Sequence, residues 1–296
     1  RPDERAAGAM STFDGQVANV VMTINNTAPV VLDGLRIFNG QRGIVKTGAG
    51  DLSILNCEIV GNHTSSASQN GIGLSLTGTA DAKLVVSNCV VSGNYGTAAN
   101  IGTGQGLYVA TFGSVVIEDT TFLTNGIACT GKDCWNEGCN GQAGAALYIN
   151  NAATTVKGCT FRGNRGSGYN NRGGIVRVAG TSGGTLFDHC VFAGNEEDFH
   201  WFNNQAPSGG NNGGQIAINL AAETDRVTIS NCTIACNFSD NTVSAAGVTV
   251  TKGTAVIKNS IIANNFVHPT NTGGADLALV DPTAHAEVSY SVLSAD

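Results

Sequence analysis

The 296-residue chain is 42% hydrophobic and 12% charged, with 40 glycines and 5 prolines. Val, Ile, Thr, Asn and Gly dominate it, a composition that favours strands and tight turns and allows a large buried core. The formal net charge of −7 argues against nucleic acid and anionic membrane surfaces, because both attract basic proteins. We expect no membrane insertion either, since no apolar run approaches the ~20 residues of a spanning helix.

Strand-like text begins soon after the N-terminus, where residues 1–15 are expected to form a short polar extension. Residues 35–57 make up the shortest repeat and contain three segments in which apolar and polar residues alternate. Alternation over four to six residues predicts half-buried strands. Comparable trios follow in the stretches 71–94, 104–125, 145–164, 174–195, 215–237, 247–265 and 275–296.

One asparagine position marks the end of each trio. Its occupants are Asn62, Asn94, Asn125, Asn164, Asn195, Asn237 and Asn265, with Asp296 in the last copy and a weaker copy at 35–40. We expect these residues to stack in a turn, where each amide donates to one neighbour and accepts from the other. Asparagine also tolerates the left-handed conformation that such a turn often needs.

A second recurring position lies five residues before each of these. It holds Cys57, Cys89, Thr120, Cys159, Cys190, Cys232, Ser260 and Ser291. These residues alternate with inward Ile or Phe, so we expect a buried ladder of small side chains in which the cysteines are free thiols.

Nine copies in one chain indicate a stack of similar units. Three strands in about 22 residues can wind around an axis, each pairing in parallel with its equivalent in the next unit. The sequence therefore predicts an all-β fold: one right-handed parallel β-helix with three strands per turn and about nine to ten turns. We expect residues 1–296 to form this single domain.

Two short motifs support the interpretation. FLTN (122–125), FRGN (161–164) and FAGN (192–195) fit F-x-x-N, and GGIV (173–176), GGQI (213–216) and GGAD (273–276) approximate GGA[ILV]. They resemble the repeats of the polymorphic outer-membrane protein family and of related bacterial surface proteins, over residues 30–296. The resemblance implies a fold of the pectate-lyase-like superfamily, display at a surface and adhesion; it carries no catalytic residue across.

Most repeats exceed the shortest one, and nearly all of the excess follows the asparagine. The inserts span about 63–71, 95–104, 126–143, 165–172, 196–212, 238–245 and 266–272. They should leave the fold at one corner, where a rigid scaffold presents them. The binding-face candidates are the insert aromatics Tyr95, Trp135, Tyr169, Phe199 and Trp201, which bind a sugar or another subunit or else cover the inserts' own small cores.

The inserts also carry cysteines and carboxylates. A disulfide among Cys129, Cys134 and Cys139 is favoured over a metal site, because the usual close pairs and a fourth ligand are absent; Cys236 is another disulfide candidate. Calcium is the one ion considered, and no other cofactor is expected. Its candidate ligands, Asp133, Glu137, Glu196, Glu197 and Asp198, match no calcium-loop consensus and are otherwise solvated side chains.

Enzymatic residues are harder to find. A polysaccharide lyase needs a base beside a charge neutraliser, and its weak candidates are Arg165, Arg172, Arg177 and His200, which no motif ties together. A hydrolase would need paired carboxylates on strand faces, and the strand segments hold only isolated ones. Asn25 begins the one glycosylation sequon that lies outside the repeated phrases and their strands.

We therefore expect an exported structural or adhesive protein of the extracellular space or cell surface, although no signal peptide is visible. Its partners would be a surface glycan or protein, or copies of itself stacked end to end, because the last repeat ends on its own ladder residue. The alternatives are a lyase acting on acidic polysaccharides and a non-catalytic glycan-binding module.

Overall fold

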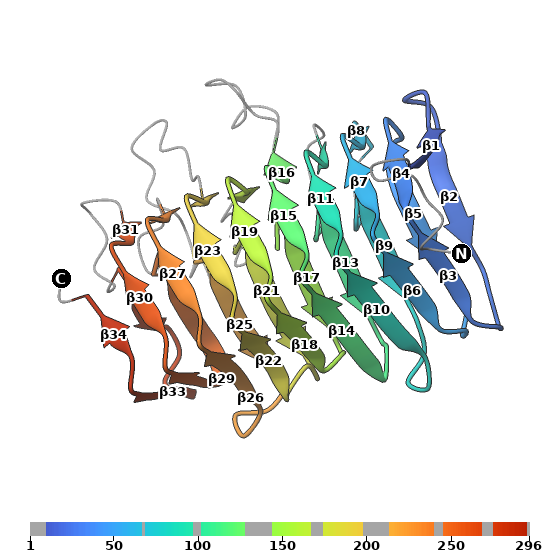
Figure 1. Cartoon of the computed structure of the whole chain (residues 1–296). Coiled ribbons are helices and arrows are strands. Elements are labelled where there is room, and N and C mark those ends of the chain that lie inside the picture. The colour runs from blue at the N-terminus through green and yellow to red at the C-terminus, as the bar shows by residue number, and fades with distance from the viewer. Residues whose placement is uncertain are drawn as a thin grey trace.

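The computed structural model describes residues 10–66, 69–96, 102–127, 144–166, 174–197, 213–239, 245–267 and 275–294. All regular secondary structure in these residues is β, and every strand pairing is parallel. Strands of successive repeats lie side by side from the N-terminal end of the stack to the C-terminal end (Figure 1). The prediction of an all-β fold with parallel sheets is confirmed.

One sheet, here sheet A, has ten strands and contains the segment just before each ladder asparagine. Its members are β1 (Ser11–Asp14), β4 (Leu35–Phe38), β7 (Glu58–Val60), β11 (Val90–Ser92), β15 (Thr121–Leu123), β19 (Thr160–Arg162), β23 (Val191–Ala193), β27 (Thr233–Ala235), β30 (Ile261–Ala263) and β34 (Val292–Leu293). Strand β1 lies within the stretch that we expected to be an N-terminal extension, and it pairs with β4 instead.

A 17-stranded sheet has two halves joined by the long strand β29 (Val248–Lys258). The half called sheet B holds β2 (Val20–Ile24), β5 (Arg42–Lys46), β9 (Leu74–Thr77), β13 (Leu107–Ala110), β17 (Leu147–Asn150), β21 (Val176–Gly180), β25 (Ile216–Leu220), β29 and β32 (Leu277–Leu279). Sheet C holds β3 (Val30–Asp33), β6 (Leu52–Leu55), β10 (Lys83–Ser87), β14 (Ser114–Glu118), β18 (Thr154–Lys157), β22 (Thr185–Asp188), β26 (Arg226–Ser230), β29 and β33 (Ala284–Ser289).

Seven repeats add a fourth strand that the sequence did not predict. These two-residue strands follow the ladder asparagines and form a seven-stranded sheet, here the corner sheet. They are β8 (His63–Thr64), β12 (Tyr95–Gly96), β16 (Gly126–Ile127), β20 (Arg165–Gly166), β24 (Glu196–Glu197), β28 (Phe238–Ser239) and β31 (Phe266–Val267). The first two residues of each insert are therefore part of the scaffold.

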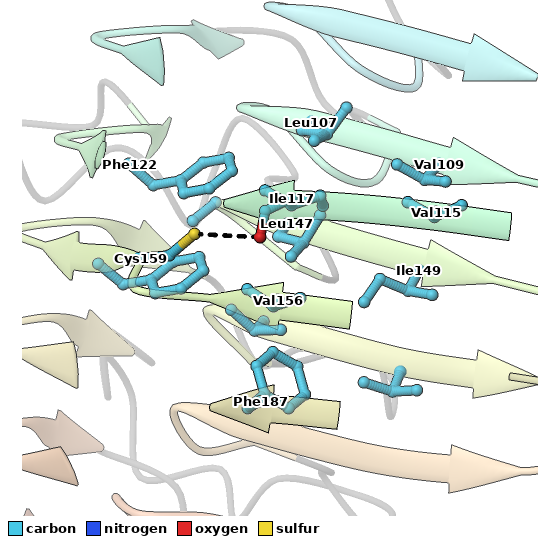
Figure 2. Close-up of a cluster of buried hydrophobic side chains, with 14 of the residues drawn as sticks. Leu107, Val109, Val115, Ile117, Phe122, Leu147, Ile149, Val156, Cys159 and Phe187 are labelled. Carbon is cyan, nitrogen blue, oxygen red and sulfur yellow. Dashed lines mark hydrogen bonds between the residues drawn. The ribbon is translucent and has the colours of Figure 1, made fainter. Parts of the chain in front are cut away.

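The core lies between the sheets, where inward side chains of successive strands stack in register. Phe122, Phe161 and Phe192 stack with ring centroids 4.8 and 4.5 Å apart and are fully buried. Figure 2 shows this part of the core and the buried thiol of Cys159, which donates to the carbonyl of Ile117 (3.5 Å). The five ladder cysteines are buried free thiols, as expected.

The asparagine ladder is continuous and buried. Asn94 Nδ2 donates to Asn125 Oδ1 (3.0 Å) and to the carbonyl of Ile59 (2.9 Å). Its Oδ1 accepts both the main-chain N–H (3.2 Å) and the side-chain amide (2.9 Å) of Asn62. Equivalent bonds link each ladder asparagine to the next as far as Asn265, so every amide both donates and accepts.

The ladder asparagines themselves are not left-handed, and here our expectation was wrong. The residue before each takes that conformation, at Gly61, Gly93, Thr124, Gly163, Gly194, Cys236 and Asn264. A second left-handed position precedes the Cys/Thr/Ser ladder, at Asn56, Asn88, Asp119, Gly158, His189, Asn231, Asn259 and Tyr290. These outer turn positions reverse the chain while the buried ladder residues supply the hydrogen bonds.

The ladder ends on an aspartate that the sequence did not single out for this role. Asn265 Nδ2 donates to Asp276 Oδ1 (2.9 Å), and Asp276 Oδ2 accepts the N–H of Ser294 (2.7 Å) and its hydroxyl. A carboxylate suits this last position because the residue there only has to accept hydrogen bonds, and an ionised carboxylate is an acceptor only. Asp296, which we expected to occupy the final ladder position, lies outside the described residues.

Candidate functional site

The corner sheet lies where each insert leaves the scaffold. Successive residues of a strand point to opposite faces. In six of these strands the first residue is the more exposed one, whereas Gly126, the first residue of β16, is buried. The first residues follow one another in register from β8 to β31. We call this row the corner column: His63, Tyr95, Gly126, Arg165, Glu196, Phe238 and Phe266.

The asparagine ladder holds the backbone of this column. The N–H of Tyr95 donates to the carbonyl of Asn62 (3.0 Å), and that of Arg165 to the carbonyl of Asn125 (2.9 Å). The N–H of Phe266 likewise donates to the carbonyl of Asn237 (2.8 Å). Each column residue from Tyr95 to Phe266 is therefore fixed directly by the asparagine ladder, whereas the N–H of His63 donates to the carbonyl of Gly40 (2.8 Å).

The column side chains are bulky and reach solvent. The rings of His63 and Tyr95 stack at one end, with centroids 5.2 Å apart and an angle of 11° between their planes. Arg165 Nε lies 3.8 Å from Glu196 Oε2 near the middle. At the other end Phe238 is half-buried and Phe266 is 59% exposed. Aromatic rings thus lie at the two ends of the column, and the ion pair lies between them.

The outward side of sheet A is different in chemistry. One of its columns runs in register from the Arg36–Glu58 ion pair (3.5 Å) through short β-branched side chains: Val90, Thr121, Thr160, Val191, Thr233 and Ile261. Such residues are common on pleated strand surfaces for reasons of backbone preference alone. The corner column instead combines stacked rings, an ion pair and an exposed phenylalanine on one line.

A buried carboxylate lies directly behind the column. Glu197 is fully buried on the inward side of β24 and accepts the N–H groups of Gly174 (2.9 Å) and Gly214 (2.6 Å) and the hydroxyl of Ser239 (3.0 Å). Burial raises its pKa to about 6, against the opposing effects of these donors and of Arg177. Gly174 and Gly214 lie where the chain re-enters sheet B after two inserts, just before β21 and β25. One carboxylate therefore binds the backbone at the start of both strands.

The structure places part of the predicted site. Tyr95, Arg165 and Glu196 lie together on the corner column, although we expected insert positions rather than strands for them. Arg177 lies on β21 and is buried, so this lyase candidate is not presented to a polymer at the surface. Further candidates lie outside the described residues: Trp135, Tyr169, Phe199, Trp201, Arg172, His200, Asp133, Glu137, Asp198, Cys129, Cys134 and Cys139.

The remaining predicted residues are the described candidates for calcium binding, a disulfide and glycosylation. Glu196 and Glu197 point to opposite faces of β24, so these two do not converge on one calcium ion as we had considered. In the described part of the chain no three His, Cys, Asp or Glu side chains gather as a metal site. Cys236 is an exposed free thiol, so the disulfide considered for it is not formed. Asn25 is exposed, and its glycosylation stays a prediction.

Sequence reasoning missed several site features. Tyr108 and Tyr148 stack on the outer side of sheet B with centroids 5.6 Å apart, and the alternation in Leu-Tyr-Val and Leu-Tyr-Ile was the signal for their outward position. The register of the column itself was also missed, since two-residue strands leave no periodic pattern to detect.

Comparison of the chain with protein-family models, with curated proteins and with solved structures finds no match. The polymorphic outer-membrane family therefore remains a hypothesis that rests on the repeat motifs. The described residues contain no helix long and apolar enough to cross a bilayer. The interpretation of the site depends on its own geometry.

Proposed function

We propose that the chain is a single right-handed parallel β-helix that acts as a rigid adhesive scaffold in the extracellular space or at a cell surface. Support for the winding comes from the pairings, because strands of sheets A, B and C each pair with their equivalents in neighbouring repeats. Repeats that contact only their neighbours suit a long, stiff support for a binding surface.

The corner column is the observation that carries the functional part of the proposal. It concentrates half-buried and exposed aromatic rings with an ion pair on one line, on a backbone fixed by buried hydrogen bonds. Aromatic and arginine side chains are the groups that dominate binding energy at interfaces. A rigid backbone lowers the ordering cost of binding, which favours recognition.

The described geometry favours binding over catalysis. Glu197 and Arg177, a carboxylate and a guanidinium that interact behind the column, are both buried. Arg165 is partly exposed but is paired with Glu196. An acid–base pair must reach the reacting atoms of its substrate, and the buried groups do not meet that requirement.

An adhesion assay tests the proposal. Immobilised extracellular polysaccharides and matrix proteins would be probed with the wild type, with a Tyr95→Ser/Phe266→Ser double variant, and with Val191→Ser as control. Val191 is 40% exposed on sheet A, so its loss removes apolar surface away from the column. We expect retention to fall only in the double variant, while circular dichroism shows the same fold for all three. Equal retention by the double variant, or lyase products absorbing near 235 nm from acidic polysaccharides, would overturn the proposal.

A further inference from the structure

We infer that Asn231 is an N-glycosylation site, modified when the chain is exported by a secretory route that transfers oligosaccharides to asparagine. The inference rests on the proposed function, because the modification requires export. Asn231, Cys232 and Thr233 form an N-x-T sequon. From the sequence we expected a glycan only at Asn25, because Asn231 belongs to one of the repeated phrases.

The structure places Asn231 in an exposed turn. It follows β26 and precedes β27, and its φ of 54° is left-handed. Its side-chain amide donates to Asp188 Oδ1 (2.8 Å) and to Ser230 Oγ (3.1 Å). Glycosylation replaces one of the two N–H groups of the amide and leaves the other. The folded turn can therefore carry a glycan and keep its hydrogen bond to Asp188.

Two other sequons are incompatible with a glycan in the folded chain. Asn62 and Asn237 also begin N-x-[ST], and both are fully buried ladder residues. Asn237 Nδ2 donates to the carbonyl of Phe192 (3.0 Å) and to Asn265 Oδ1 (2.9 Å). A glycan on this nitrogen would remove one of these buried bonds and would lie inside the core, whereas glycans are bulky and need the surface. Of the four sequons in the chain, the exposed ones are those of Asn25 and Asn231.

Comparison between repeats shows how specific the arrangement is. Three equivalent left-handed turns also hold an asparagine, but the residue two positions later has no hydroxyl group. These pairs are Asn56 with Glu58, Asn88 with Val90, and Asn259 with Ile261. Thr121 and Thr160 have the hydroxyl, but Asp119 and Gly158 occupy their turns. Among the equivalent turns that the structure describes, the turn at Asn231 alone combines the asparagine with the hydroxyl.

A glycan at Asn231 would leave the corner column open. Asn231 precedes β27 and the column residue Phe238 follows it, so the two lie at opposite edges of sheet A. The sugar would instead extend over the outward side of sheet A, where Thr233 is half-buried and its neighbour in register, Ile261, is 48% exposed. The glycan therefore adds polar, solubilising bulk away from the proposed contact surface.

The transfer step requires a polyprenyl-pyrophosphate-linked oligosaccharide as co-substrate. The amide nitrogen of Asn231 forms a bond to C1 of the first sugar, and the bond from C1 to the pyrophosphate oxygen breaks. The amide proton leaves with the pyrophosphate, so the step involves no oxidation or reduction.

Peptide mapping of the whole chain secreted from a eukaryotic cell line tests the inference. Peptide-N-glycosidase leaves an aspartate at each occupied position. We expect this conversion at Asn231 and none at Asn62 or Asn237. Thr233→Val should abolish it at Asn231, and valine fits there because Val191 is the neighbour in register. Thr233→Ser keeps the hydroxyl group and should keep the glycan.

Val90→Thr is the matched gain-of-function variant. It gives the exposed turn residue Asn88 a hydroxyl two residues later, so Asn88 should become occupied. An unmodified Asn231 in the secreted wild type, a glycan retained in Thr233→Val, or an unmodified Asn88 in Val90→Thr would overturn the inference. Thermal melts of the unglycosylated proteins made in bacteria check that each variant folds.

The two proposals fail separately. If Tyr95→Ser/Phe266→Ser loses adhesion while Asn231 is unmodified, the inference fails and the proposed function stands. If Asn231 is modified while the double variant adheres like the wild type, the proposed function fails instead.

Discussion

Truncating one asparagine in the middle of the ladder should be among the most damaging polar substitutions in this protein. The side chain of Asn164 makes four hydrogen bonds. It donates to the carbonyl of Phe122 (2.9 Å) and to Asn195 Oδ1 (2.9 Å), and its Oδ1 accepts the main-chain N–H (3.0 Å) and side-chain amide (3.1 Å) of Asn125. Asn164→Ala removes all four from a site with no solvent exposure.

The expected cost follows from the groups left behind. The N–H of Asn125 loses its acceptor, its amide loses one of its two, and the carbonyl of Phe122 loses a donor. A buried polar group without a partner costs about 1–3 kcal/mol. We therefore expect Asn164→Ala to lower the free energy of unfolding by about 3–6 kcal/mol, a large share of the roughly 5–15 kcal/mol that a folded domain has in total.

Urea unfolding followed by circular dichroism measures this difference, with a second probe to check that the transition is cooperative. Asn88→Gly is the matched control. Asn88 is exposed, has φ 52° and donates its side-chain amide to Asn56 Oδ1 (2.7 Å). Glycine keeps that backbone conformation, so the control should cost no more than about 1 kcal/mol. An Asn164→Ala cost no larger than that of the control would refute the argument that the ladder bonds stabilise the fold.

Four further predictions concern single positions. The pKa of Glu197 is raised to about 6 from its ordinary 4.5, so its protonated form adds stability that is fully present below pH 4.5 and lost as pH rises through 6. The stability of the wild type relative to Glu197→Ala should fall by about 2 kcal/mol between pH 4.5 and 7 in chemical denaturation, and a constant difference would contradict this. Cys190→Ser should cost about 1 kcal/mol or less by thermal melting, because Ser260 and Thr120 occupy the same ladder position; a loss above about 3 kcal/mol would show that the thiol itself is needed. Gly194→Asn should be tolerated within about 1 kcal/mol, since a Cβ there meets nothing within 4 Å and Asn264 adopts the same conformation. Gly113→Ala, whose Cβ would lie 1.8 Å from the carbonyl oxygen of Ala80, should destabilise strongly in the same melts.

Regular spacing made the ladders predictable from the sequence. Asn94 and Cys89 recur at a fixed separation in successive repeats, so stacking of like residues followed directly, and both side chains are buried as expected. The same spacing did not show which turn residue is left-handed. That choice depends on how the backbone closes around the ladder, and glycine before most of the asparagines was the available signal.

Features that depend on contacts between residues distant in the sequence could not be predicted from it. Asp276 completes the ladder, although it lies in a GGAD segment eleven residues beyond Asn265 and after an insert of unrelated length. Glu197 stands among consecutive acidic residues, which usually indicate a solvated loop. Its burial follows from the two-residue strand β24, whose alternation sends Glu196 outward and Glu197 inward.

Scaffold and site are separable in this fold, and that separation supports a functional interpretation of the corner column. The ladder fixes the column through main-chain groups, such as the N–H of Glu196 on the carbonyl of Asn164 (3.0 Å). These main-chain bonds do not depend on the identity of the outward side chains. Where packing does not dictate a side chain, an exposed aromatic ring such as Phe266 needs another explanation, and contact with a partner supplies one.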